Sequence, residues 1–214
     1  MKTRAARRPP HERRKLILEG AERVFAAAGY GGADTTALAR AGGVSAPALY
    51  RYFPTKKDLY IATLQTAARR LVEIWRRIVD EAADPLEAMT TIAGGYYEHG
   101  GSQPSVMRLW FQALSDTDAP EVRAALRENF TALAGLLEEC LREAKVRRLI
   151  DTDVDPRMAA WDFMSIGFTF ELSRLIGMGD KLDRRSFDAW RRHYFTSIGV
   201  RRTRPASRRV VRGA

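Results

Sequence analysis

The stretch "DTTALARAGGVSAPALYRYFPTKKDL", residues 34–59, constrains the fold of this chain more than any other part of its sequence. Two short runs of helical character are separated by Gly42 and Gly43, and Pro54 ends the second run. Glycine permits a tight turn, and Ser45 can cap the second helix because its hydroxyl accepts from the free amides of the first turn. The pattern predicts two short helices joined by a turn, which is a helix-turn-helix.

Helical signals also precede this stretch. Apolar residues recur at helical spacing from Ile17 to Ala28, and Gly29 follows as a stop. Thr35 and Thr36 can cap the first of the two short helices with their hydroxyls. The sequence therefore predicts a three-helix unit.

Helix starts then repeat along the rest of the chain. Thr55 with Asp58 has the spacing of a capping box at the start of a fourth helix, which we expect to run to about Ala83. No stretch has the alternating pattern of a strand. We therefore expect an all-α protein of about nine helices. The later predicted starts are Asp84 with Pro85, Pro104 with Ser105, Asp118 to Pro120, Asp155 with Pro156, and Asp183.

Positive charge gathers at the two ends of the chain. Residues 1–60 hold 12 lysines and arginines against 5 acidic residues, and residues 201–214 hold 6 against none. Residues 61–200 hold 18 against 21 and are slightly acidic. This distribution indicates that one end of the molecule meets a polyanion while the middle does something else. The other interpretation is that arginine is simply frequent throughout the chain.

Few residues are suited to catalysis or metal binding. The chain has three histidines and one cysteine, Cys140, which excludes a thiolate zinc cluster and an internal disulfide. It carries no metalloprotease, Walker or dinucleotide-glycine motif. No apolar run reaches the roughly 18 residues of a membrane span. We expect a cytoplasmic protein that is not an enzyme and has no cofactor, no metal and no membrane partner.

The N-terminal pattern as a whole, residues 11–60, resembles the DNA-binding domain of the tetracycline repressor (TetR) family of bacterial transcriptional regulators. The resemblance implies an all-helical fold with an N-terminal three-helix helix-turn-helix domain and a C-terminal helical domain for ligand binding and dimerisation. It also implies association with the bacterial nucleoid when bound to DNA. The expected division is a basic disordered arm at 1–10, the DNA-binding domain at 11–57, the ligand-binding and dimerisation domain at 58–200, and a basic disordered tail at 201–214.

The resemblance also assigns residues to DNA. In the helix-turn-helix, Leu38 of the first helix and Leu49 of the second face inward, while small residues at 46 and 48 allow close approach and methyl contacts with thymine. Carried over by position, Thr35, Thr36 and Lys56 meet phosphate. Base contacts are expected from Ala46, Pro47, Ala48 and Tyr50. Arg51 and Tyr52 lie at base or phosphate positions. The full expected set is Thr35, Thr36, Ser45, Ala46, Pro47, Ala48, Tyr50, Arg51, Tyr52 and Lys56.

Two glycines depart from the usual pattern of the family. Gly20 and Gly42 stand where alanine is more common. Each would lower helix stability by about 1 kcal/mol if it lies inside a helix. Neither departure removes a DNA contact.

Large apolar side chains are frequent between residues 105 and 176. At helical spacing such residues form an ordinary core or line an apolar ligand pocket, and the resemblance favours a pocket for the set. The residues expected to line it are Trp75, Met107, Trp110, Phe111 and Phe168.

Two apolar stripes lie in the last two predicted helices. They can pack on each other within one chain, or form a symmetric four-helix dimer interface, which the resemblance favours. The residues expected at this interface are Trp161, Met164, Leu172, Leu175, Phe187, Trp190, Tyr194 and Ile198.

These patterns predict a homodimeric DNA-binding regulator. We expect a repressor that a small apolar or amphipathic effector releases from a palindromic double-stranded DNA operator. The alternative is a DNA-binding regulator that needs no ligand or that recruits a partner protein. The sequence does not name the effector, the operator or the regulated genes.

Overall fold

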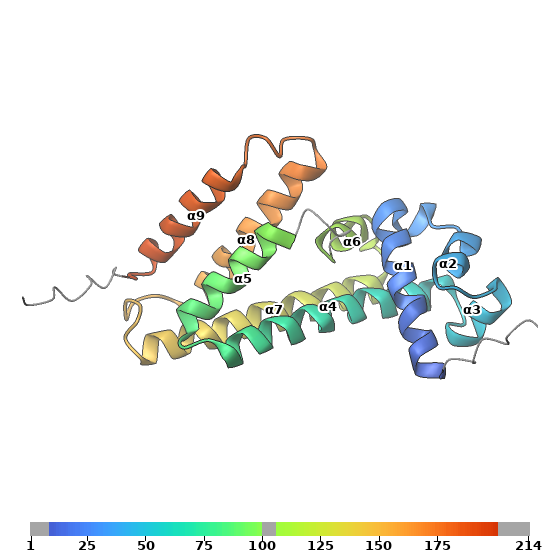
Figure 1. Ribbon diagram of the computed structural model, residues 1–214, viewed down its shortest axis with the longest axis horizontal. Helices are drawn as coiled ribbons and strands as arrows, with labels where there is room; N and C mark the ends of the chain where they lie inside the picture. The colour runs from blue at the N-terminus through green and yellow to red at the C-terminus, as the bar shows by residue number, and fades with distance from the viewer. Residues whose placement is uncertain (1–8, 100–105, 201–214) are drawn as a thin grey trace, which may run out of the picture.

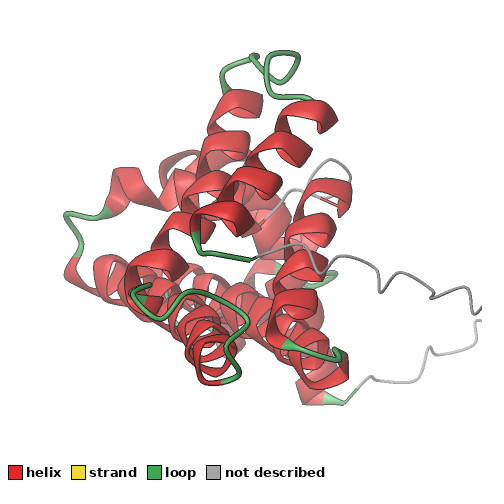
Figure 2. Cartoon of the chain, turned by 90° about the vertical axis from the view of Figure 1, so that its left-hand side faces the viewer, coloured by secondary structure: helices red, strands yellow, loops and turns green. Residues whose placement is uncertain are grey.

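The computed structural model describes residues 9–99 and 106–200. Within these ranges the chain is all-α, as predicted, with nine α-helices, one 3-10 helix and no strand (Figures 1 and 2). The predicted N-terminal arm, apart from Pro9 and Pro10, and the predicted tail at 201–214 lie outside the described residues. The helices are α1 (Pro10–Gly32), α2 (Thr35–Ala41), α3 (Ala46–Tyr52), α4 (Lys56–Glu81), α5 (Pro85–His99), α6 (Val106–Ala113), η1 (Leu114–Asp116), α7 (Pro120–Val146), α8 (Pro156–Leu175) and α9 (Arg184–Ser197).

The helices form two units joined by one long helix. The N-terminal unit comprises α1, α2, α3 and the first turn of α4, and it lies at one end of the molecule (Figure 1). The helical body comprises the rest of α4 and everything after it. Helices α4 and α7 pack side by side along the body, α9 lies at the end far from the N-terminal unit, and α6 packs against α1 (Figure 1). Helix α4 therefore connects the two units physically.

Short-range polar contacts start the helices of the N-terminal unit. Ser45 Oγ accepts from the Ala48 amide at 3.4 Å, as the sequence predicted. The capping box of α4 is also confirmed, with 3.0 Å between the Asp58 amide and Thr55 Oγ1. The threonine cap of α2 was predicted wrongly, because the preceding residue Asp34 accepts from the Ala37 amide at 3.1 Å.

Two close backbone approaches hold α1 against α2. A Cβ at Gly20 would lie 2.4 Å from the carbonyl carbon and oxygen of Ala41, and a Cβ at Gly42 would lie 3.0 Å from Ile17 Cα. Glycine at these positions therefore allows a helix contact that alanine would obstruct. Gly29, at φ 66°, ends the regular part of α1 where the sequence predicted a stop.

Aromatic rings hold α9 on the helical body. Phe187 lies 4.9 Å from Tyr97 of α5 and 5.6 Å from Phe170 of α8, measured between ring centroids. Tyr194 packs on Phe163 at 5.3 Å and donates its hydroxyl to the Ala159 carbonyl at 2.9 Å. These contacts join segments that lie far apart in the sequence.

Candidate nucleic-acid interface

Helices α2 and α3 form the predicted helix-turn-helix. The turn passes through Gly43 at φ 66°, and the Val44 amide donates to the Ala39 carbonyl at 2.9 Å. Leu38 and Leu49 are 1% and 2% exposed, so both anchor the motif to the core as predicted. Helix α3 is thereby fixed at the end of the molecule.

The outward side of α3 contains most of the residues that were predicted to contact DNA. Pro47, Tyr50 and Arg51 are exposed, whereas Ala46, Ala48 and Tyr52 are half-buried. Of the other predicted residues, Thr36 and Ser45 are exposed, and Thr35 and Lys56 are half-buried. Their assignment to DNA remains a prediction, but the fold gathers all of them around one helix.

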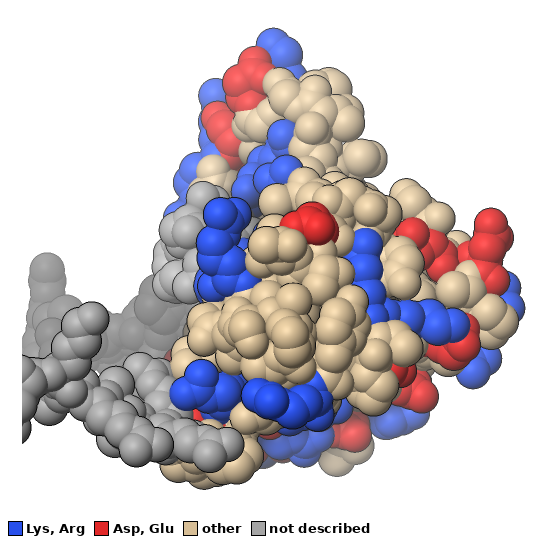
Figure 3. Space-filling model, turned by 90° about the vertical axis from the view of Figure 1, so that its right-hand side faces the viewer, with Lys and Arg blue, Asp and Glu red and all other residues tan. Residues whose placement is uncertain are grey.

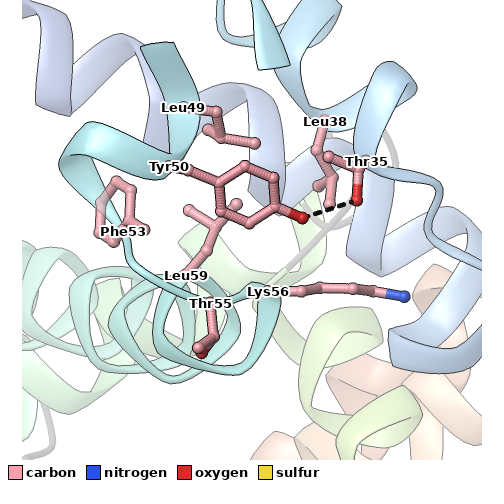
Figure 4. A pocket seen from close by; sticks show the side chains of 8 residues that line it. All are labelled: Thr35, Leu38, Leu49, Tyr50, Phe53, Thr55, Lys56 and Leu59. Carbon is pink, nitrogen blue, oxygen red and sulfur yellow. Dashed lines mark hydrogen bonds between the residues drawn. The ribbon is translucent and has the colours of Figure 1, made fainter. Parts of the chain in front are cut away.

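One flank of α3 carries two hydroxyl groups and an ammonium group. Tyr50 Oη lies 3.2 Å from Thr35 Oγ1, within hydrogen-bond distance (Figure 4). Lys56 extends from the start of α4 across the ring of Tyr30, with its Nζ 4.7 Å from the ring centroid. The Tyr50 phenol is therefore held toward the start of α2.

The other flank borders a cleft between α3 and the start of α1. Its volume is about 630 Å³. Arg13 of α1 and Arg51 of α3 both line it, together with Tyr52, Ser45 and Ala48. Helix α3 thus lies between a hydroxyl-rich flank and an arginine-lined flank. Figure 3 shows this end of the molecule, where lysine and arginine side chains lie around an uncharged area.

Polar contacts tie the N-terminal unit to the helical body. Lys57 Nζ donates to Glu121 Oε1 of α7 at 2.8 Å, which raises the pKa of Lys57 and lowers that of Glu121. Tyr60 is fully buried and donates its hydroxyl to Asp116 at 3.0 Å. Burial, followed by the Asp116 carboxylate, raises the pKa of Tyr60 far above its usual range. The start of α4 is therefore anchored to the connection between α6 and α7.

Sequence reasoning missed several residues of this region. Asp34 went unnoticed as a cap because Thr35 and Thr36, whose hydroxyls can also cap a helix, follow it directly. Arg13 belonged to a basic run, and nothing in that run indicated which arginine would face α3. Tyr60 and Asp116 are separated by 56 positions, and no local pattern connects them.

The residues that were predicted to line a ligand pocket divide into two groups. Phe111 of α6 and Phe168 of α8 lie 6.5 Å apart between ring centroids, and Phe130 of α7 joins them, 5.4 Å from Phe168. Trp110 is 2% exposed and packs on Phe130, so it belongs to the core. The fold brings these α6, α7 and α8 rings together. Met107 and Trp75 are half-buried at the edge of the core, on α6 and α4 respectively.

The predicted dimer residues also divide. On α8, Trp161, Leu172 and Leu175 are 41%, 48% and 41% exposed and share one face. Trp190 is half-buried against Phe163. The apolar residues of α9 pack on α8 of the same chain. Of the predicted dimer residues, those on the exposed face of α8 are therefore the ones that a second copy could contact. Buried inside the chain are Met164, Phe187, Tyr194 and Ile198.

Two further properties concern only the part of the chain that the structure describes. There, no three histidine, cysteine or acidic side chains gather in a way that could hold a metal ion. None of the helices at 9–99 and 106–200 has the length and apolarity needed to cross a membrane.

The N-terminal unit matches a known family. The model for "Bacterial regulatory proteins, tetR family" matches residues 17–63, which contain most of α1, all of α2 and α3, and the start of α4. The N-terminal unit is therefore a TetR-family DNA-binding unit. This confirms the resemblance that the sequence of the helix-turn-helix indicated.

Two relatives and one solved structure illustrate the similarity. The transcriptional activator FasR of Mycolicibacterium smegmatis is 31% identical over 124 residues, which cover 58% of this chain and 56% of FasR. The transcriptional repressor AcnR of Corynebacterium glutamicum is 40% identical over 70 residues, which cover 33% of this chain and 37% of AcnR. The match thus spans about half of FasR and about a third of AcnR, and both proteins regulate transcription.

The solved structure is described as "Molecular basis for control of antibiotic production by a bacterial hormones". It is 25% identical, has a TM-score of 0.74, and covers 89% of this chain and 99% of its own. The likeness to this structure therefore includes the helical body, beyond the residues that the family model matches.

Proposed function

We propose that this chain is a homodimeric, DNA-binding transcriptional repressor that leaves its operator when a small apolar or amphipathic molecule binds the helical body. The observation that carries the proposal is the placement of α3. It is anchored on Leu49, exposes Pro47, Tyr50 and Arg51, and lies between two flanks that carry hydroxyl and cationic groups.

This arrangement suits the major groove of DNA. A recognition helix must present short side chains to the base edges and cationic or hydroxyl groups to the phosphates on either side. Helix α3 has small residues at 46 and 48 and Arg51 one turn later. The N-terminal unit therefore supplies both classes of contact within one short helix.

The exposed face of α8 supports the dimer. Met158, Trp161, Leu172 and Leu175 are each at least 41% exposed on this helix. A second copy related by twofold symmetry would cover the same face on both chains. The two copies of α3 would then reach two half-sites of a palindromic operator.

The ring cluster of α6, α7 and α8 supports the effector site. Ligand sites in helical proteins lie between helices and are lined mostly by apolar side chains with a few polar groups. The indole Nε1 of Trp110 is buried and has no hydrogen-bond partner among the described residues. An effector oxygen beside this cluster would supply an acceptor for that donor.

The contacts of α4 supply the connection between the two sites. Helix α6 carries Trp110 toward the ring cluster and leads directly into Asp116, which holds Tyr60 of α4. An effector that displaces α6 therefore changes the support of the N-terminal unit. The effector can release DNA only to the extent that it prefers the displaced state.

The test is selection of genomic DNA fragments by the purified full-length chain, followed by affinity measurements on a recovered fragment. Arg51→Ala should weaken binding by about tenfold or more, because a charge-assisted contact is lost. Arg185→Ala is the matched control, since Arg185 is exposed on α9, a helix outside the N-terminal unit. The proposal fails if no fragment is enriched, or if the two variants bind equally.

A further inference from the structure

The polar side chains of α3 are directed to its two flanks. Among the seven residues of this helix, only Tyr50, Arg51 and Tyr52 have polar side-chain atoms. The Tyr50 hydroxyl lies 3.2 Å from that of Thr35 on α2, so the phenol is held on that side (Figure 4). A hydroxyl pair fixed in this way suits a phosphate oxygen, which accepts hydrogen bonds from any sequence.

The remaining two polar side chains lie on the opposite flank. Arg51 and Tyr52 line the cleft of about 630 Å³ together with Arg13 at the start of α1. Arg13 and Arg51, one from each helix that lines the cleft, can both donate to one phosphate, because a phosphate accepts hydrogen bonds from several directions. Both flanks of α3 therefore fit the DNA backbone.

The first three residues of α3 have no side-chain hydrogen-bonding group. Ala46, Pro47 and Ala48 have none by their chemistry. Ser45, the residue before them, accepts from the Ala48 amide at 3.4 Å and lines the arginine-lined cleft, so the proton that its hydroxyl can still donate belongs to that flank. This part of α3 cannot read the donors and acceptors of a base edge with its side chains. It can make apolar contacts, and in the major groove the apolar group is the C5 methyl of thymine.

We propose that α3 contacts the phosphate backbone of DNA through Tyr50, Arg51 and Tyr52. In this proposal, α3 distinguishes DNA sequences through contacts of Ala46, Pro47 and Ala48 with thymine methyl groups. The inference rests on the proposed DNA-binding function and specifies how the operator is recognised. It differs from the expectation that Tyr50 contacts a base, because the hydrogen bond to Thr35 holds the phenol on the flank of α3 where we place a DNA phosphate.

The experiment replaces thymine by deoxyuridine, one position at a time, in a fragment recovered by selection. Uracil keeps every hydrogen-bonding group of thymine and lacks only the methyl group. We expect one or more positions in each half-site at which affinity falls about fourfold for each methyl removed, the value for one buried carbon group. Replacing the contacted thymines of both half-sites together should lower affinity by roughly 16-fold. Binding to a scrambled fragment should not change.

Protein variants identify which side chain makes each contact. Ala48→Gly and Ala46→Gly each remove one methyl group from α3. In the variant that lacks the partner of a given thymine, uracil at that position should have no further effect, as a double-mutant cycle requires. Tyr50→Phe should weaken binding to the selected and scrambled fragments by the same factor. Melting temperatures of all variants establish that the fold is retained.

Two outcomes overturn the inference. If uracil has no effect at any position while 7-deazaguanine at one position abolishes discrimination, a polar side chain reads guanine and the apolar model is wrong. Uracil effects that persist unchanged in Ala46→Gly, in Ala48→Gly and in Pro47→Gly, which removes the proline ring, also contradict it, because the methyl groups would then contact something other than α3. If unmodified selected and scrambled fragments bind equally well, the proposed function itself fails, and the inference fails with it.

Discussion

Polar caps start helices in both the N-terminal unit and the helical body, but the two units differ in how their helices are joined. In the N-terminal unit, polar caps start α2, α3 and α4 within a few residues of sequence, at Asp34, Ser45 and Thr55. In the body, aromatic rings join helices that are far apart in the chain, as Phe187 of α9 does with Tyr97 of α5. Local signals therefore specify much of the surface that we propose for DNA, and long-range packing specifies the surfaces that we propose for an effector and for a second copy.

The largest expected effect tests the outer surface of the body. Trp161→Asp would place an unpaired charge in the proposed interface once on each chain, so we expect the dimer dissociation constant to rise by about 100-fold or more. Sedimentation equilibrium at several concentrations measures this change.

Val146→Asp is the control for this prediction. Val146 is 83% exposed at the end of α7, off the exposed face of α8, so its charge should leave the dimer unchanged. A wild-type protein that is monomeric at micromolar concentration would show that the exposed face of α8 is not a dimer interface.

The second prediction concerns the contact between α1 and α2. Gly20→Ala would place a Cβ 2.4 Å from backbone atoms of Ala41, so we expect the free energy of unfolding to fall by about 1–3 kcal/mol. The loss should occur although alanine is the better helix former. Urea unfolding at one fixed protein concentration measures it.

Gly135→Ala, in the middle of α7, is the matched control. Apart from the neighbouring residues and the nearby backbone of α7 itself, no heavy atom lies within 4 Å of the added Cβ, so helix propensity alone should raise stability by about 0.5–1 kcal/mol. If both substitutions stabilise the protein, the close approach of α1 and α2 does not exist in solution.

Features that depend on neighbouring residues could be predicted from the sequence, whereas those that depend on distant residues could not. Ser45 and Thr55 were identified as caps because each contact spans three residues. Periodicity showed that Phe187 and Trp190 share an apolar face but not what covers that face, since the partner helix lies elsewhere in the chain. Gly20 was interpreted as a loss of helix propensity because only the folded structure shows Ala41 beside it.

The smallest predicted effect tests the corrected cap of α2. Asp34→Ala removes the acceptor of the Ala37 amide, and we expect a loss of about 1 kcal/mol in the free energy of unfolding. Thr36→Ala should change stability by much less, because Thr36 does not cap the helix. Urea unfolding measures both effects. If Thr36→Ala destabilises the protein more than Asp34→Ala does, a threonine caps α2 and the correction is wrong.

The most direct test of the account is the affinity of the full-length protein for a selected fragment and for a scrambled fragment of the same composition. Fluorescence anisotropy at physiological salt provides both dissociation constants. The account predicts that the selected fragment binds more tightly by a factor of about 10³ or more, because α3 contacts bases as well as phosphates. Equal affinity for the two fragments would contradict it.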